Sequence, residues 1–319
     1  MQRSYVIHLA TALFVLASGC EQSGGTATGG SAGASSTGSG QGGTGGTGQG
    51  GDNVGGTFAG SGGAGGGVGG GGGSAEVCDG IDNDNDGTID NVDVGNDGIC
   101  DCLRIATLGL PGQWGNGDVF ASWLDARSDN GAVSLNDQVL TKELLDQYQV
   151  IVAQNLSEIN RTYSADEVAA LSAWVNAGGG FMTLIGYGDP TERTNVNTLL
   201  GAFSMSYGEQ QILPKSGGAT IPVTNWVTHP VTSGVTSIGV DNGYPVVGMG
   251  QTIATEQGHD LLKAQEVGSG HVLLWGDEWI TYDSEWTGHP EYQLELFWLN
   301  AIKWLTPAKN CQVVIPPPK

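Results

Sequence analysis

The sequence predicts an α/β fold for residues 103–311, with a parallel sheet covered by helices on both faces. Short apolar runs of strand length, at 103–108, 149–153 and 181–185, alternate with segments that have helical spacing. These runs are almost continuously apolar, as is typical of parallel strands buried on both faces. Both observations place the main folded domain in the carboxyl-terminal two-thirds of the chain.

The elements follow one another in a regular order. The first helix is expected at 117–127, and a second begins at a capping box of Ser164 and Glu167 and ends at glycines 178–180. A helix near 195–200 precedes shorter strands, at 212, 221–223, 235–240 and 252–255. The chain closes with a hairpin of 261–266 and 271–275, turned at 267–270, and a helix at 292–305.

Residues 1–20 have the pattern of a bacterial lipoprotein signal. An apolar stretch at 6–17 is too short to span about 30 Å of hydrocarbon as a helix. It ends in Ala17-Ser18-Gly19-Cys20, which resembles a lipobox, whose cysteine is lipidated and becomes the mature N-terminus. We therefore expect an exported protein anchored to a bacterial membrane through Cys20, with the outer membrane or the cell surface favoured. An ordinary signal peptide with an incidental cysteine is the alternative.

Residues 21–75 are expected to form a disordered tether. They consist mainly of Gly, Ser, Thr, Ala and Gln, and they hold about half of the chain's 56 glycines. Such a segment buries too little apolar surface to offset the entropy that ordering would cost. Random-coil scaling gives it a reach of roughly 40 Å. A Pro-rich tail at 312–319 follows the main domain.

The charge of the chain excludes two classes of partner. Its formal net charge is −22, from 33 acidic and 11 basic residues. Such an excess of carboxylates argues against binding to nucleic acid and against electrostatic docking on anionic lipid.

An acidic module at 76–102 contains a calcium-loop pattern. Carboxylates stand at loop positions 1, 3, 5, 9 and 12, a glycine at position 6 permits a sharp turn, and position 7 offers its backbone carbonyl. The expected calcium ligands are Asp82, Asp84, Asp86, Thr88, Asp90 and Asp93. Helical flanks are absent, so an isolated stiffening loop is expected in place of a paired EF-hand. The alternative is an acidic, disordered hinge.

The cysteines of the exported part suggest disulfides. With Cys20 assigned to the lipid, four remain, and an even number in an oxidising compartment favours two bridges. We expect Cys78–Cys100 to close the acidic module and Cys102–Cys311 to tie the ends of the main domain together. A zinc site is the alternative, although the four cysteines lack paired CxxC spacing.

The run from Val77 to Gly87 resembles the Cys-Asp-Gly-x-Asp-Asn-Asp-Cys-Asp-Gly repeats of secreted MopE-type proteins. This resemblance implies metal binding. Asn85 replaces the second cysteine of that repeat, which directs Cys78 to a more distant partner. Acidic spacing continues at Asp93, Asn96, Asp97 and Asp101, where a second ion is an open alternative, as in thrombospondin-type repeats.

The order of elements over 103–306 resembles the class I glutamine-amidotransferase-like fold, a flavodoxin-like three-layer sandwich. The resemblance is carried by three segments: the strand and turn that end at Gly186-Tyr187-Gly188, the sequence His229-Pro230-Val231, and residues 270–277. Catalytic members of that fold carry a cysteine in the turn after the third strand. The turn at 185–189 holds neither cysteine nor serine, so the resemblance implies a domain without the nucleophile.

A ligand cleft is expected where the loops after the strands converge at the carboxyl edge of the sheet. The candidate residues there are Gln113, Trp114, Asn155, Tyr187, Asp189, Asp277, Glu278 and Trp279. Aromatic, amide and carboxylate side chains suit a glycan or a peptide, and we expect a non-catalytic binding domain. One alternative is an extracellular hydrolase with Asp189 and Glu278 as acid and base. Another is that Trp275, Trp298 and Trp304 belong to the core, while Trp279, Tyr282 and Trp286 only pack a long loop.

Overall fold

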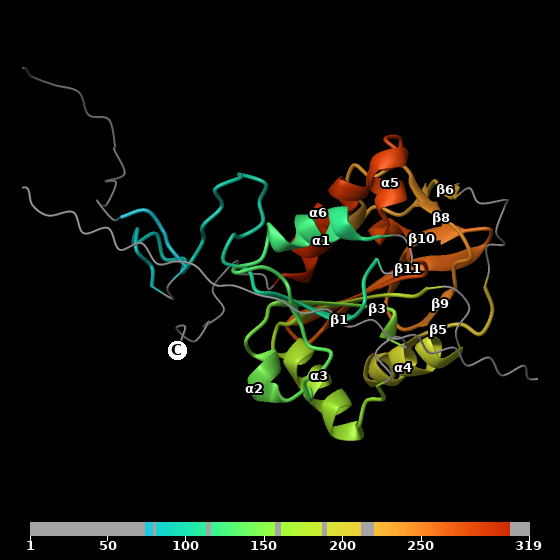
Figure 1. Cartoon of the computed structure of the whole chain (residues 1–319), viewed down its shortest axis with the longest axis horizontal. Coiled ribbons are helices and arrows are strands. Elements are labelled where there is room, and N and C mark those ends of the chain that lie inside the picture. The colour runs from blue at the N-terminus through green and yellow to red at the C-terminus, as the bar shows by residue number, and fades with distance from the viewer. Residues whose placement is uncertain are drawn as a thin grey trace, which may run out of the picture. The chain divides into compact units, whose positions relative to one another are not determined.

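An eight-stranded mixed sheet forms the centre of the protein (Figure 1). The computed structural model describes residues 74–78, 81–112, 116–156, 161–186, 190–211 and 220–306. In spatial order the strands are β2 (Val133–Ser134), β1 (Ile105–Gly109), β3 (Val150–Gln154), β4 (Gly180–Leu184), β12 (Gly270–Trp275), β11 (His259–Val267), β10 (Gln251–Glu256) and β7 (Asn225–Trp226).

The sheet is parallel in its first half and antiparallel in its second. Strands β2, β1, β3, β4 and β12 pair in parallel. Strands β12, β11, β10 and β7 then pair antiparallel, which confirms the predicted β11–β12 hairpin. The predicted parallel sheet is therefore right for the half that contains the strand–helix units, and the hairpin extends it as an antiparallel wing.

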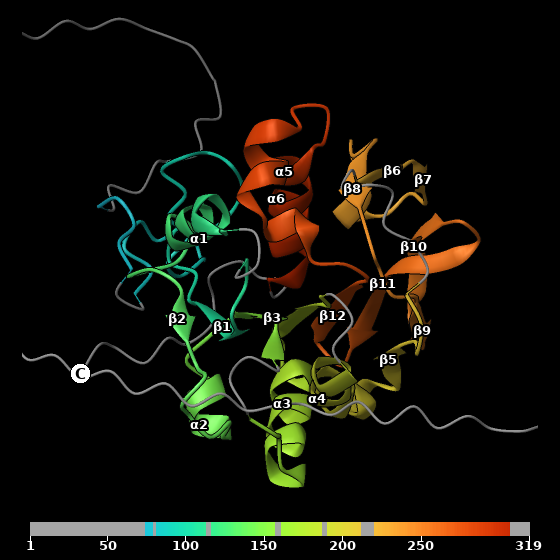
Figure 2. The same ribbon diagram turned by 45° about the vertical axis from the view of Figure 1, so that its right-hand side comes forward.

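Helices cover both faces of the sheet, as predicted. Helices α1 (Asp118–Asp125), α5 (Asp283–Gly288) and α6 (Leu294–Leu305) lie on one face. Helices α2 (Lys142–Leu145), α3 (Ala165–Asn176) and α4 (Pro190–Leu200) lie on the other (Figure 2). Two hydrophobic clusters result. For example, Met182 of β4 belongs to the α1/α6 side, whereas its neighbour Phe181 faces α3.

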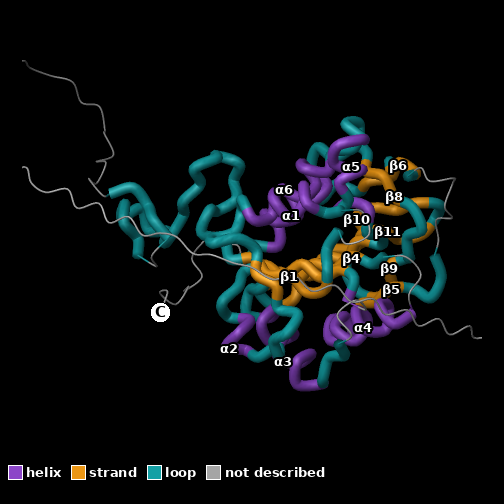
Figure 3. The backbone as a smooth tube through the Cα atoms, viewed as in Figure 1, coloured by secondary structure: helices purple, strands orange, loops and turns teal. Residues whose placement is uncertain are grey.

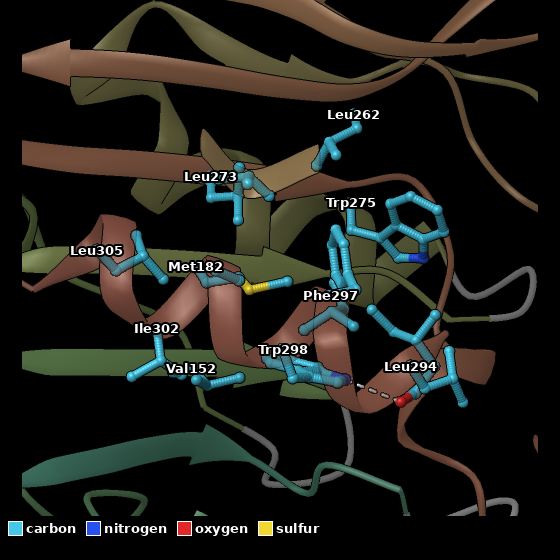
Figure 4. Packing of buried hydrophobic residues seen from close by; sticks show 14 of the residues in the cluster. Val152, Met182, Leu262, Leu273, Trp275, Leu294, Phe297, Trp298, Ile302 and Leu305 are labelled. Carbon is cyan, nitrogen blue, oxygen red and sulfur yellow. Dashed lines mark hydrogen bonds between the residues drawn. The ribbon is translucent and has the colours of Figure 1, made fainter. Parts of the chain in front are cut away.

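Large aromatic residues fill the α6 side of the core, and the indole N–H groups of Trp298 and Trp174 are paired, whereas that of Trp275 is buried without a partner among the described residues. Trp275, Phe297 and Trp298 are fully buried against β4 and β12 (Figure 4). The indole N–H of Trp298 donates to the backbone oxygen of Ile280 at 3.0 Å. On the opposite side the indole of Trp174 donates to the oxygen of Tyr148 at 3.1 Å. Satisfied donors remove most of the cost of burying an indole.

Sequence patterns located the long elements and the short strands β6 (Ile221–Val223) and β8 (Ile238–Val240), but missed several other short elements. The capping box of Ser164 and Glu167 opens α3 as predicted. Two small antiparallel sheets surround the wing: β5 (Met205–Tyr207) with β9 (Val246–Gly248), and β6 with β8. Short 3-10 helices lie at Gly201–Phe203, Pro230–Thr232 and Trp279–Thr281. Strands β2, β5, β7 and β9 and helices α2 and α5 had not been predicted, because runs of two to six residues show no periodicity. The strand expected at residue 212 lies outside the described residues.

The module that precedes β1 consists of turns. From residue 81 to residue 104 the chain forms no helix or strand (Figure 3). All described residues belong to one unit, Gly67–Lys319. Among them, no helix has the length and apolar character needed to cross a membrane. The predicted segments 1–20, 21–75 and 312–319 lie almost entirely outside the described residues.

The disulfide of the module differs from the prediction. Cys78 pairs with Cys102, with their Cα atoms 5.4 Å apart, and not with Cys100. Cys102 is therefore unavailable to Cys311, which itself lies outside the described residues. Cys100 is also disulfide-bonded. The prediction failed because residues 100 and 102 differ by only two positions, so spacing alone cannot decide which sulfur faces Cys78.

Candidate functional sites in the acidic module and at the carboxyl edge

The first acidic turn of the module is built around the carboxylate of Asp82. Its two oxygens accept the backbone N–H groups of Asp86 at 3.1 Å and Gly87 at 3.0 Å. Asn85 and Gly87 adopt left-handed backbone angles, with φ of 59° and 95°, which close the turn tightly. The glycine at this position was predicted for that reason.

Glu76, which the loop pattern did not include, is the residue that completes this turn. Its carboxylate accepts the N–H of Asp84 at 2.7 Å and that of Asp90 at 3.0 Å. Carboxylate oxygens of Glu76, Asp82 and Asp84 lie within 4.8 Å of one another. Such an oxygen-only cluster matches what a hard cation such as Ca²⁺ prefers.

The remaining predicted ligands lie around this cluster but are engaged differently. Asp86 accepts the N–H of Thr88 at 2.7 Å, and Asp90 is fully buried. The carboxylate of Asp93 turns to the next segment, where it accepts the N–H of Asp97 at 3.1 Å. The structure therefore brings Asp82 and Asp84 together with Glu76, whereas Asp93 begins a second turn.

At the carboxyl edge of the sheet, Glu192 ties two strand ends together. One oxygen of its carboxylate accepts the N–H of Asn155, after β3, at 3.0 Å and that of Gly186, after β4, at 3.2 Å. Glu192 stands in the first turn of α4, where a carboxylate also interacts favourably with the helix dipole. It was not among the predicted site residues, and because the helix was expected only near 195–200, its place in the first turn of α4 was missed as well.

The carboxylate of Glu278 fills the space beside Gly186, in the residues that follow β4. A Cβ added to Gly186 would lie 2.1 Å from Oε2 of Glu278 and 2.9 Å from Oδ1 of Asn155. Both side chains are buried, Glu278 at 4% exposure and Asn155 at 0%. Position 186 thus has no room for a side chain, because a carboxylate from the end of β12 takes that space.

Asp277 lies beside this carboxylate in a buried acidic group. Its two oxygens accept the N–H groups of Asp241 at 3.0 Å and Glu278 at 2.7 Å. Burial raises its pKa well above the ordinary range, against the lowering effect of these two hydrogen bonds. Burial, with the nearby carboxylate of Glu278 as the second cause, also raises the pKa of Tyr282. The carboxyl edge of the sheet is therefore rich in hydrogen-bond acceptors, and its buried groups disfavour the ionised form.

The structure unites only part of the predicted cleft. Asn155, Asp277 and Glu278 meet at the carboxyl edge, and the half-buried Trp279 packs its ring 5.2 Å from that of Tyr282. Oδ1 of Asn155 is buried without a hydrogen-bond partner, while its Nδ2 donates to Leu110. Gln113, Trp114, Tyr187 and Asp189 lie outside the described residues, so the pairing of Asp189 with Glu278 stays a prediction.

Comparisons with known proteins reveal structural neighbours only. No protein-family model matches the chain, and no curated protein matches it. It is similar in structure to the cytoplasmic protein STM1381 of Salmonella typhimurium LT2, with a TM-score of 0.48 and 16% identity over 64% of this chain and 100% of that one. STM3548 of Salmonella typhimurium gives a TM-score of 0.43 and 13% identity over the same shares.

An enzyme is also among these neighbours. The exo-β-1,4-mannosidase Op5Man5 of Opitutaceae bacterium strain TAV5 matches with a TM-score of 0.40 and 14% identity, over 66% of this chain and 37% of the mannosidase. All three TM-scores are below 0.5, so these likenesses do not bear on function.

Proposed function

We propose that the chain is a non-catalytic, exported bacterial lipoprotein whose calcium-stabilised module presents an amidotransferase-like binding domain. The domain is a flavodoxin-like sandwich in this proposal, and its ligand, a glycan or a peptide, occupies the carboxyl edge of the sheet. Cys20 carries the lipid, and residues 21–75 form the tether.

The observation that carries the proposal is the filled turn at Gly186. Covalent catalysis by the amidotransferase route needs a side-chain nucleophile at the end of the third predicted strand. The turn at 185–189 holds neither cysteine nor serine, and at Gly186 the carboxylate of Glu278 takes the space a side chain would need. The same edge keeps a buried amide oxygen on Asn155 without a partner, which supports binding of a donor-bearing group.

The calcium part rests on the first acidic turn. Three carboxylates within 4.8 Å repel one another unless a cation lies among them. Glu76, Asp82 and Asp84 would hold the ion, and the ion would supply rigidity to the segment that joins tether and domain. The Cys78–Cys102 disulfide is in keeping with an oxidising compartment.

A binding and turnover assay tests the proposed role of the main domain, residues 103–311, which we call the head. The full chain is screened with soluble glycans and peptides by thermal shift, beside panels of ester, amide and glycoside substrates. We expect a ligand whose stabilising shift is reduced in E278Q and kept in E143Q, an exposed control on α2. Turnover that is lost in E278Q would overturn the proposal and favour the hydrolase with Asp189 and Glu278.

A separate titration tests whether Ca²⁺ binds at the first acidic turn. Addition of Ca²⁺ to chelator-treated protein should raise the free energy of unfolding by about 2.7 kcal/mol at a hundredfold excess over Kd. D84N should lose this gain, whereas D137N, which removes an exposed carboxylate of the head, should keep it. Equal responses of the two variants would contradict the assignment.

A further inference from the structure

The module contains two turns of the same construction, eleven residues apart. In the first turn, Asp82 accepts the N–H groups of residues 86 and 87. In the second turn, Asp93 accepts those of residues 97 and 98, at 3.1 and 2.9 Å. The left-handed residues recur at the same places, with φ of 50° at Asn96 and 76° at Gly98. The second turn is therefore a structural copy of the first.

The two copies differ in their carboxylates. Asp84, which joins the cluster of the first turn, corresponds to Gly95 in the second. In the part of the chain that the structure describes, the grouping of three carboxylates occurs at the first turn only. The second turn thus keeps the backbone shape of the first but has lost a carboxylate that would hold an ion.

A cation from the main domain reaches the second turn directly. Oδ2 of Asp97 lies 3.3 Å from Nε of Arg127, and the side chains are only 30% and 17% exposed. In the first turn the corresponding Oδ2, on Asp86, accepts the side-chain amide of Asn91 instead. Lys303, in the last turn of α6, places its ammonium 2.7 Å from the point where a Cβ on Gly98 would lie. Two basic side chains of the domain therefore converge on the copy with fewer carboxylates.

Arg127 is held firmly in this place. Its guanidinium lies 3.9 Å from the ring centre of Trp123, and one of its nitrogens donates to the backbone oxygen of Trp123 at 3.1 Å, at the end of α1. A second nitrogen lies 3.4 Å from the carboxylate of Glu295. Stacking and capping pre-position the charge, so little side-chain entropy is lost when it pairs with Asp97.

We propose that Arg127 takes the place of the metal ion in the second turn, which works as a docking contact between module and head. The module then holds one ion, at the first turn, and a fixed guanidinium at the second. Ile99, which follows Gly98 and is 3% exposed, enters the core cluster of the α1/α6 face and completes the contact. The ion count rests on the proposed function, whereas the docking contact does not.

Isothermal titration with Ca²⁺ and hydrogen exchange on the full chain test this inference. We expect one ion per chain, lost in D84N and kept in D97N, because the amide oxygen that D97N introduces can still accept the N–H of Ile99. Amide exchange in 93–101 should rise about three- to fivefold in D97N and in R127Q, the effect of a partly exposed ion pair. The D97N/R127Q double variant should exchange no faster than either single variant.

Each outcome is decisive for one half of the inference. Two ions in the wild type, or a lower count in D97N, would make the second turn an ion site and overturn the proposal. Unchanged exchange in both single variants would remove the docking contact. If the wild type binds no ion, the calcium proposal fails, and faster exchange in R127Q would still establish the contact.

Discussion

Replacing Gly186 by alanine tests whether the turn after β4 is as full as the structure shows. The new Cβ would lie 2.1 Å from Oε2 and 2.7 Å from Cδ of Glu278, distances that no real contact tolerates. Glu278 is 4% exposed, so its carboxylate has little free volume into which it can move. The backbone of Gly186 does not lie in the left-handed region, so alanine itself introduces no strain there.

The size of the effect follows from two opposing contributions. Overpacking a buried site costs about 1–3 kcal/mol. Replacing glycine by alanine at a permitted backbone conformation returns about 0.4–1 kcal/mol by restricting the unfolded chain. The net loss is therefore about 1–2 kcal/mol, which lowers Tm by about 3–6 °C in a domain of about 200 residues.

The assay is differential scanning calorimetry of G186A and a matched control. A Cβ added to Gly201, at the end of α4, meets no atom within 4 Å, so G201A should be neutral or slightly stabilising. The cost of G186A should fall below about 1 kcal/mol in an E278A background, where the residual contact is with Oδ1 of Asn155. A G186A variant with the Tm of G201A, or an equal cost in both backgrounds, would refute the filled turn.

Two further predictions concern the module and the histidines. The Cys78–Cys102 bridge spans 24 residues, for which chain entropy gives about 3–4 kcal/mol, so the C78S/C102S variant should unfold at a clearly lower temperature; an unchanged calorimetric Tm would speak against the bridge. Burial lowers the pKa of His229 and His271 below the ordinary 6.5, against the raising effect of Glu266. Their contribution to stability is therefore complete above pH 6.5 and declines as the pH falls below it. H271Q should lose less stability than the wild type between about pH 7.5 and about pH 5.5 in urea titrations, and parallel losses would exclude this linkage.

Local signals in the sequence predicted the long elements of the fold well. Helix α3 begins where Ser164 and Glu167 form their capping box, and α6 occupies Leu294–Leu305 within the predicted 292–305. These elements have apolar periodicity over three turns and recognisable ends, so short-range chemistry decides them. Strand β2 has two residues and pairs with β1 only through tertiary packing, which leaves no local trace.

The candidate sites were predictable only where the ligands are close in sequence. The pattern from Asp82 to Asp90 is a local code, but Glu76 enters the cluster because the chain before the loop folds back onto it. The contact between Gly186 and Glu278 joins residues from neighbouring strands, β4 and β12, that are far apart in the chain. The pairing of distant strands depends on the whole fold, and no spacing of residues in the sequence predicts it.

The Cys78–Cys102 bridge also determines how mechanical load would travel through the protein. A pull on the chain ahead of Cys78 passes through the covalent bond to Cys102, which lies three residues before β1 and is 1% exposed. The 23 residues between the two cysteines lie outside this path. Tension applied ahead of Cys78 would then be borne by β1 inside the parallel sheet, and the acidic turns would keep their shape.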